Sequence, residues 1–180
     1  MDDEPNPIKD ILYDEISNIG EDIIQKEIAN KNTSRIIKKI TMPCIKKIKR
    51  LEGTYQTNVA KFQTSLLHYL LTLVMIPSQR KITMNNIEID IVIPDLRTLK
   101  NESNNSILIS IPDAHVQDVS EQIESLKNIQ SNDENIWYVT EQDINQKKYS
   151  ISDGGFYRIL DDIEEFLSKT KTRQFRFFKA

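Results

Sequence analysis

The stretch Ile87-Glu88-Ile89-Asp90-Ile91-Val92-Ile93 has the alternating pattern of a β-strand. Isoleucine occupies positions 87, 89, 91 and 93, and a period of two places these side chains on one face and Glu88 and Asp90 on the other. Acidic residues are poor strand formers and neighbouring like charges repel, so the pair requires a local reason. A metal site would supply one, and a solvated sheet face would supply another. The sequence leaves both interpretations open.

Further strands and helices are predicted on either side of this stretch. A strand over 81–84 precedes it across Asn85-Asn86, a dipeptide suited to a tight hairpin turn. Strands are also expected over 107–111, 136–139 and 149–152, and helices over 57–76, 116–126 and after Gly154-Gly155, with Asp113 as the cap of the middle one. The alternation in 173–179 predicts an edge strand at the end of the chain. The expected fold is α/β, with a mixed central sheet of four to five strands flanked by helices.

The first part of the chain is predicted to be helical. We expect an N-terminal helical extension over 1–53 and an α/β domain over 54–180. Residues 7–30 are interpreted as one amphipathic helix weakened at Gly20, with an apolar stripe of Ile8, Leu12, Ile16, Ile19, Ile23 and Ile24. A second helix is expected to begin at Thr33 or Ser34 and to end or kink at Pro43.

Charge is distributed unevenly along this extension. The net charge of the chain is -3, but residues 1–33 carry nine acids and three bases, whereas residues 34–62 carry eight bases and one acid. This asymmetry predicts either pairing between the two segments or an interaction surface. Cations bind nucleic acid by releasing counterions from phosphates, and the candidate contacts are Lys38, Lys39, Lys46, Lys47, Lys49 and Arg50.

Several classes of protein are disfavoured by composition. The single Cys44 excludes an intrachain disulfide and a cysteine-based zinc site, which is typical of a reducing compartment. No apolar run approaches the roughly 20 residues that span a bilayer, and the acidic start is unlike a signal peptide. We therefore expect a cytoplasmic protein without a membrane partner. The paired glycines lack the rest of a phosphate-binding loop.

The order of helix, hairpin, third strand and crossover helix, with an acidic second strand, resembles the restriction-endonuclease-like superfamily, the PD-(D/E)xK nucleases. The resemblance covers roughly residues 57–140. In that family a helix supplies an acidic residue or Gln, the second strand an Asp, and the third strand an acidic residue and a Lys two positions apart. The carboxylates hold Mg²⁺, a hard cation that prefers oxygen ligands and activates water.

The resemblance implies site residues in this chain, and it also shows a departure. Asp90 matches the second-strand Asp, and Gln63 is the match for the helix residue. On the third strand, Ser110 stands where the acid is expected and Pro112 where the Lys is expected. One Asp and one Ser form a weak anchor for Mg²⁺. The prediction is a nucleic-acid-associated protein whose nuclease-like core has lost efficient phosphodiester hydrolysis.

Two alternatives remain open. The first is an active nuclease that uses Mg²⁺, with Asp90 and Glu88 as metal ligands, Gln63 and Ser110 in the site, and a cation reaching across the hairpin from Arg80 or Lys81. The second is a scaffold protein whose amphipathic N-terminal helices form a homodimer or bind a protein partner. DNA and RNA are both candidate ligands of the basic segment.

Overall fold

A five-stranded mixed sheet lies at the centre of the computed structural model, which describes residues 6–112 and 116–177. Its strands are β1 (Gln79–Met84), β2 (Ile87–Ile93), β3 (Ile107–Ser110), β4 (Ile136–Val139) and β5 (Lys148–Tyr149), and they lie in sequence order. The pairs β1–β2 and β2–β3 are antiparallel, whereas β3–β4 and β4–β5 are parallel. The prediction of an α/β fold with a mixed sheet is confirmed.

Helices surround this sheet. They are α1 (Pro7–Ile19), α2 (Glu21–Ala29), α3 (Thr33–Ile48), α4 (Tyr55–Leu73), α5 (Leu96–Asn101), α6 (Val116–Lys127) and α7 (Ile159–Phe177). Short 3-10 turns occupy Ser103–Asn105, Asp133–Asn135 and Gly155–Arg158. The cap expected at Asp113 lies outside the described residues. No helix in the described ranges combines the length and apolar character needed to cross a bilayer.

The N-terminal segment differs from its prediction at one glycine and one proline. The single helix expected over 7–30 is wrong, because Gly20 takes a φ of 94° and separates α1 from α2. This positive φ is unfavourable for residues with a Cβ but accessible to glycine. The break also turns Ile23 outward, so Ile23 is exposed while Ile24 and Ile28 are buried. Of the end or kink expected at Pro43, the end is wrong, because α3 continues through this proline to Ile48.

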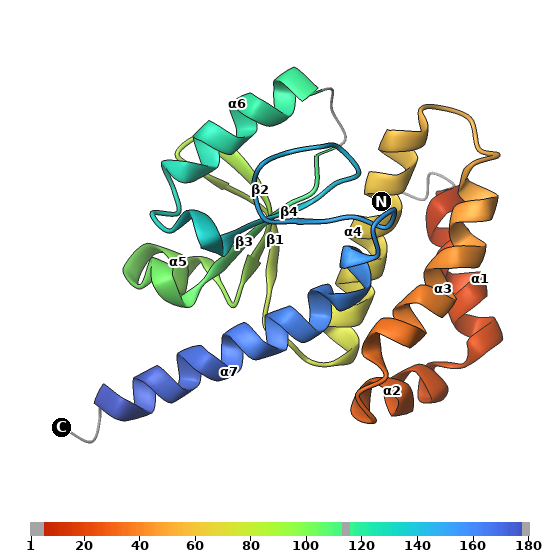
Figure 1. Ribbon diagram of the computed structural model, residues 1–180, viewed down its shortest axis with the longest axis horizontal. Helices are drawn as coiled ribbons and strands as arrows, with labels where there is room; N and C mark the ends of the chain where they lie inside the picture. Colours follow the sequence, from red (N-terminus) through yellow and green to blue (C-terminus); the bar gives the residue numbers. More distant parts are fainter. Residues whose placement is uncertain (1–5, 113–115, 178–180) are drawn as a thin grey trace.

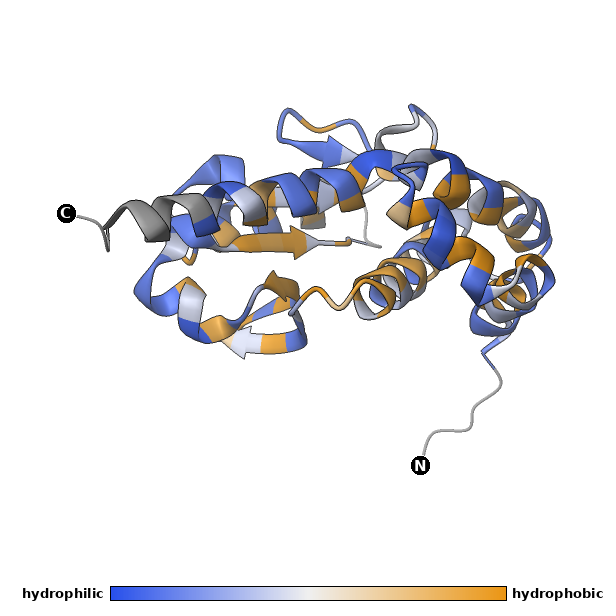
Figure 2. Cartoon of the chain, turned by 90° about the horizontal axis from the view of Figure 1, so that it is seen from below, coloured by the Kyte–Doolittle hydropathy of each residue, from blue (hydrophilic) through white to orange (hydrophobic). Residues whose placement is uncertain are grey.

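Two apolar cores lie on the two faces of the sheet. Side chains of α1–α4 and the start of α7 pack against one face, which includes Ile91, Ile93, Ile109 and Trp137. Side chains of α6 and Leu99 of α5 pack against the other face. Figure 2 colours apolar stretches of the central strands and of the helices beside them in orange. The N-terminal helices thus share a core with the sheet, and the domain boundary at residue 53 stays a prediction.

Strand β2 changes the face on which it buries its isoleucines. Ile89 packs in the core beneath α6, whereas Ile91 and Ile93 pack in the core beneath α4. The expectation that positions 87, 89, 91 and 93 share one face is therefore wrong. The change takes place at Asp90, where the strand has its only half-buried acidic side chain.

The end of the chain is helical where a strand was expected. The pattern in 173–179 predicted an edge strand, but α7 continues to Phe177, and the last three residues lie outside the described part. α7 crosses beside the sheet and then extends past the body of the protein (Figure 1). Its first turns are buried through Ile159, Leu160 and Ile163, which fixes this helix to the sheet.

Candidate functional site

Asp90 lies where the second strand meets the end of the third. Its carboxylate Oδ2 accepts a hydrogen bond from the backbone N–H of Ile111 at 2.7 Å. Ile111 directly follows β3, so this contact brings the Asp90 carboxylate to the C-terminal end of that strand. A hydrogen bond to an ionised carboxylate is about twice as strong as a neutral one and fixes the side chain.

Ser110 lies beside this contact. The last register pair of β2 and β3 on this side is Ile91 with Ile109, so Asp90 and Ser110 are the next residues of the two strands. The Ser110 side chain is 2% exposed, and its hydroxyl has no hydrogen-bond partner among the described residues. Pro112, at the position expected to carry a Lys, is buried. Over the described residues Ser110 to Pro112, this strand end therefore offers a hydroxyl group and a proline ring and no charged side chain.

Gln63 is engaged elsewhere. It lies in α4, is 1% exposed, and donates its Nε2 to Glu141 Oε1 at 3.2 Å. The Glu141 carboxylate also accepts backbone hydrogen bonds from Ile151 at 2.7 Å and Ser152 at 3.1 Å. Glu141 follows the end of β4, so Gln63 joins α4 to this sheet edge and to the segment before α7.

Glu141 was missed by the sequence analysis. It is a single acid after a buried strand, and no spacing pattern joins it to Gln63, which precedes it by 78 residues. Only the packing of α4 against the sheet brings them together. The weak sequence signal for Glu141 was the position of its carboxylate at the C-terminal end of a parallel strand.

Glu88 does not join this group. It is exposed and stands opposite Thr83 in the β1–β2 ladder, whereas Asp90 is half-buried. Within 6–112 and 116–177 no three His, Cys, Asp or Glu side chains come together as a metal site. Mg²⁺ demands octahedral oxygen coordination. The half-buried Asp90 carboxylate beside the buried Ser110 hydroxyl does not fit that demand. The assignment of Asp90 and Glu88 as metal ligands therefore stays a prediction.

The basic residues of the second segment form an exposed surface on α3 and the turn after it, named here the α3 basic face. It consists of Lys38, Lys39, Lys46, Lys47, Lys49 and Arg50, all exposed. The opposite face of α3 is buried through Ile36, Ile37, Ile40 and Ile48. Among the described residues none of the six forms an ion pair with α1 or α2, and Lys49 lies 5.8 Å from the ring centre of Tyr55.

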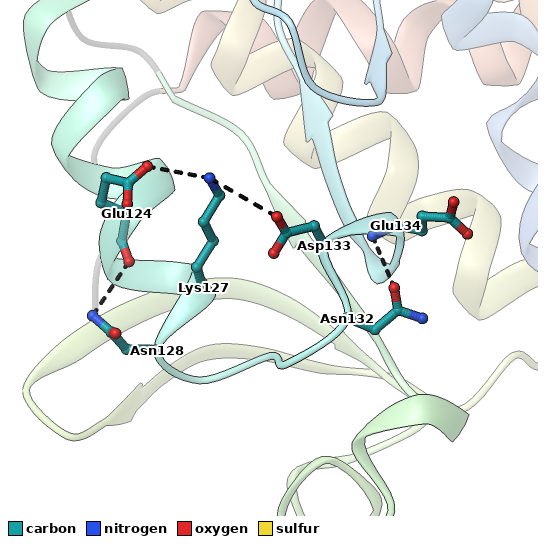
Figure 3. A network of polar contacts seen from close by, with 6 residues as sticks. All are labelled: Glu124, Lys127, Asn128, Asn132, Asp133 and Glu134. Carbon is teal, nitrogen blue, oxygen red and sulfur yellow. Dashed lines mark hydrogen bonds and ion pairs between the residues drawn. The ribbon is translucent and has the colours of Figure 1, made fainter.

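A cavity of about 730 Å³ lies between the start of β4, the β4–β5 loop and α7. Its lining carries both charges, including Lys127, Asp133, Lys147 and Glu165. Lys147 lies 4.0 Å from the ring centre of Trp137, which is buried and also lines the cavity. At one rim Lys127 bridges Glu124 of α6 at 3.2 Å and Asp133 at 3.9 Å (Figure 3). These contacts hold the segment that connects α6 to β4. Because the lining of the cavity carries charges of both signs, it does not favour a ligand of either charge.

Comparison with known proteins bears on the fold. No protein-family model matches the sequence, and no curated protein matches it at a significant level. A solved structure described as a complex of the restriction endonuclease PspGI with substrate DNA is similar, with a TM-score of 0.60 and 16% sequence identity. The match covers 92% of this chain and 94% of that one. The chain therefore has a restriction-endonuclease-like fold.

Proposed function

We propose that this protein binds nucleic acid through a restriction-endonuclease-like core that does not hydrolyse phosphodiesters efficiently. The observation that carries the proposal is the environment of Asp90. Its carboxylate is held by the backbone of Ile111, and Ser110 at the end of β3 and Pro112 just after it stand in place of an acid and a Lys. Among the described residues, this strand end has no side chain that would concentrate positive charge on a phosphate.

Binding is supported by the α3 basic face. Six exposed cations lie along α3 and the turn after it, and they make no ion pair in the described ranges that would neutralise them. Unpaired lysines and arginines gain affinity for DNA or RNA when they displace condensed counterions. The similar solved structure is itself a DNA complex, which makes double-stranded DNA the first probe to use.

Binding can be tested by fluorescence anisotropy with labelled duplex DNA and single-stranded RNA over a range of salt concentrations. Lys46→Glu/Lys47→Glu is expected to weaken binding by roughly tenfold or more in low salt, and to lower the slope of log affinity against log salt by about 2. The matched control is Arg97→Glu/Lys100→Glu on α5, where both side chains are also exposed. Equal losses in the two double variants would contradict a localised binding face.

The active-nuclease alternative is tested with the same probes in Mg²⁺ or Mn²⁺. We expect both nucleic-acid probes to stay intact for hours when the protein is in excess. Cleavage that depends on the metal and that disappears in Asp90→Ala would contradict the proposed loss of hydrolysis. It would not contradict the proposed binding of nucleic acid. The Asp90→Asn protein is the folding control, because an amide oxygen can still accept the hydrogen bond from Ile111.

A further inference from the structure

We propose that the cavity beside Trp137 binds a small zwitterion with an apolar side chain, the chemistry of a free α-amino acid. Lys147 pairs with the carboxylate of this ligand, and Glu134 pairs with its ammonium group. The cavity is distinct from the strand end that holds Asp90. It lies at the start of β4, and because β3 and β4 are parallel, Ile111 lies at the opposite end of these strands. The inference is therefore independent of nucleic-acid binding.

Lys147 brings a cation into the cavity without an ion-pair partner. Its Nζ lies 4.0 Å from the ring centre of Trp137 and 5.8 Å from that of Tyr149, and within the described ranges the ammonium makes no hydrogen bond or ion pair. The ring faces attract the ammonium but replace only part of its hydration. Burial accordingly lowers the pKa of Lys147, although three nearby carboxylates act in the opposite direction. A carboxylate on a ligand supplies the partner that the ammonium lacks.

Glu134 provides the complementary charge. Its backbone oxygen accepts a hydrogen bond from the Trp137 indole Nε1 at 3.0 Å, which fixes the residue beside the ring. Among the described residues its carboxylate forms no ion pair, and Figure 3 shows it directed away from the pair of Lys127 and Asp133. Glu134 and Lys147 thus line one cavity without pairing with each other. A ligand that carries both charges can pair with both side chains.

The other charged groups of the cavity already have partners in the described structure. They are Lys127 with Asp133 at 3.9 Å, Lys169 with Glu165, and Asp162 with the Tyr149 hydroxyl at 2.8 Å. A simple anion would compensate only Lys147 and would lie near several carboxylates, whereas a simple cation would compensate only Glu134. A zwitterion compensates both charges, which agrees with a lining of mixed sign.

Apolar surface lies next to these two charges. Trp137 and Phe166 both line the cavity, with ring centres 6.4 Å apart and an interplanar angle of 80°. Phe166 is half-buried, so its ring is partly accessible. Asn145 and Gln146 of the β4–β5 loop add side-chain amides to the lining. The volume of about 730 Å³ is in the range of small-molecule pockets, and it leaves room for an apolar side chain against the two rings.

Trp137 is the only tryptophan of the chain, so its fluorescence reports directly on the cavity. The test compares three probes that share a phenyl ring. Phenylalanine is a zwitterion, phenylpropionate carries only the anion, and phenethylamine carries only the cation. We expect phenylalanine to change the tryptophan emission with a saturable dependence on concentration. Each singly charged probe should bind about tenfold more weakly, because one of the two charges in the cavity stays without a partner.

Single variants identify the charged contacts. Lys147→Met is expected to weaken the binding of phenylalanine about tenfold and to leave that of phenethylamine unchanged. Glu134→Gln is expected to weaken the binding of phenylalanine to the same degree and to leave that of phenylpropionate unchanged. The matched control Lys171→Met removes an exposed ammonium of α7 that does not line the cavity. Isothermal titration calorimetry measures each affinity independently of any effect of the substitution on tryptophan emission.

The effect of charge is separated from an effect on folding by Lys147→Arg, which keeps the cation and is expected to retain binding. The inference is overturned if phenylalanine gives neither a saturable change in emission nor a heat of binding. It is also overturned if either singly charged probe binds as tightly as phenylalanine, or if Lys147→Met binds phenylalanine as well as Lys171→Met does. Lys46→Glu/Lys47→Glu should bind phenylalanine normally, so failure of the proposed function would leave this inference unaffected.

Discussion

The side-chain amide of Gln63 donates a hydrogen bond of 3.2 Å to the carboxylate of Glu141, which lies 78 residues further along the chain. The same carboxylate accepts the backbone N–H groups of Ile151 and Ser152. One acidic side chain thus joins α4, the end of β4 and the segment that leads into α7. Gln63, which the family resemblance marked as a site residue, has a structural partner in Glu141.

Loss of the Glu141 carboxylate should destabilise the protein. Glu141→Ala leaves the buried Gln63 amide and two backbone N–H groups without their acceptor, and we expect the free energy of unfolding to fall by about 2–4 kcal/mol. Urea denaturation followed by circular dichroism measures this change. The control is Asp143→Ala in the same loop, whose single 3.6 Å ion pair with Lys148 is at the surface and worth under about 1 kcal/mol. Equal losses would show that Glu141 is no more than a surface charge.

His68 should make stability depend on pH near neutrality. Burial lowers the pKa of His68 below its usual 6.5, and the nearby charges of Arg80 and Lys9 lower it further. The unfolded chain therefore takes up the proton at a higher pH than the folded one does. The resulting stabilisation is complete above about pH 6.5 and is lost as pH falls through the lower folded-state pKa.

The measurement is the melting temperature of the native protein and of His68→Gln between pH 5 and 8. We expect the native protein to lose stability relative to the variant as the pH falls, because glutamine does not titrate. The other ionisable groups are common to both proteins and cancel in the comparison. A difference in melting temperature that is constant over this range would contradict the lowered pKa.

Local sequence patterns predicted most of the sheet. The period of two in β2 and the Asn85-Asn86 turn gave the hairpin, and both asparagines take the positive φ that a tight hairpin turn requires. The third and fourth strands were found because short apolar runs without helical spacing indicate buried parallel strands. The short helix α5 was missed, although Asp95 caps it by accepting a hydrogen bond from the backbone N–H of Thr98.

The remaining errors arose where packing decides between two local patterns. Residues 7–30 keep a helical spacing across Gly20, and only the packing of two separate helices on α3 shows the break there. The alternating phenylalanines near the C-terminus resembled a strand, but α7 had already begun and simply continues. In the candidate site, Asp90 and Ser110 follow from strand register. Glu141 does not, because its partner lies on a distant helix.

Cys44 should be unreactive in the folded protein. Its side chain is fully buried in α3, and its Sγ donates to the backbone oxygen of Ile11 in α1 at 3.8 Å. Burial raises the pKa of this thiol to about 12, and the charge of Glu15 adds to the increase, so almost no thiolate is present at neutral pH. We expect a thiol reagent to label Cys44 only after α1 separates from α3. Labelling followed over urea concentration measures that opening, and rapid labelling without denaturant would contradict the packing of the two helices.

Ile16 and Ile23 separate the scaffold alternative from simple unfolding. Ile16 is 5% exposed within the core, whereas Ile23 is 46% exposed on α2, and Met42 of α3 is also exposed. Ile16→Asp places a charge among apolar side chains, and we expect it to prevent folding. Ile23→Asp removes only an exposed apolar side chain, so its melting temperature should stay within about 2 °C of the native value.

Sedimentation velocity then shows whether the N-terminal helices form a contact between proteins. If they form a homodimer, Ile23→Asp and Met42→Asp should shift the protein toward the monomer while the circular dichroism spectrum is unchanged. Gln25→Asp, on the exposed surface of the same helix, is the matched control for added negative charge. A native protein that is monomeric at high concentration would contradict the homodimer. A dimer that both apolar variants leave intact would place its interface away from α2 and α3.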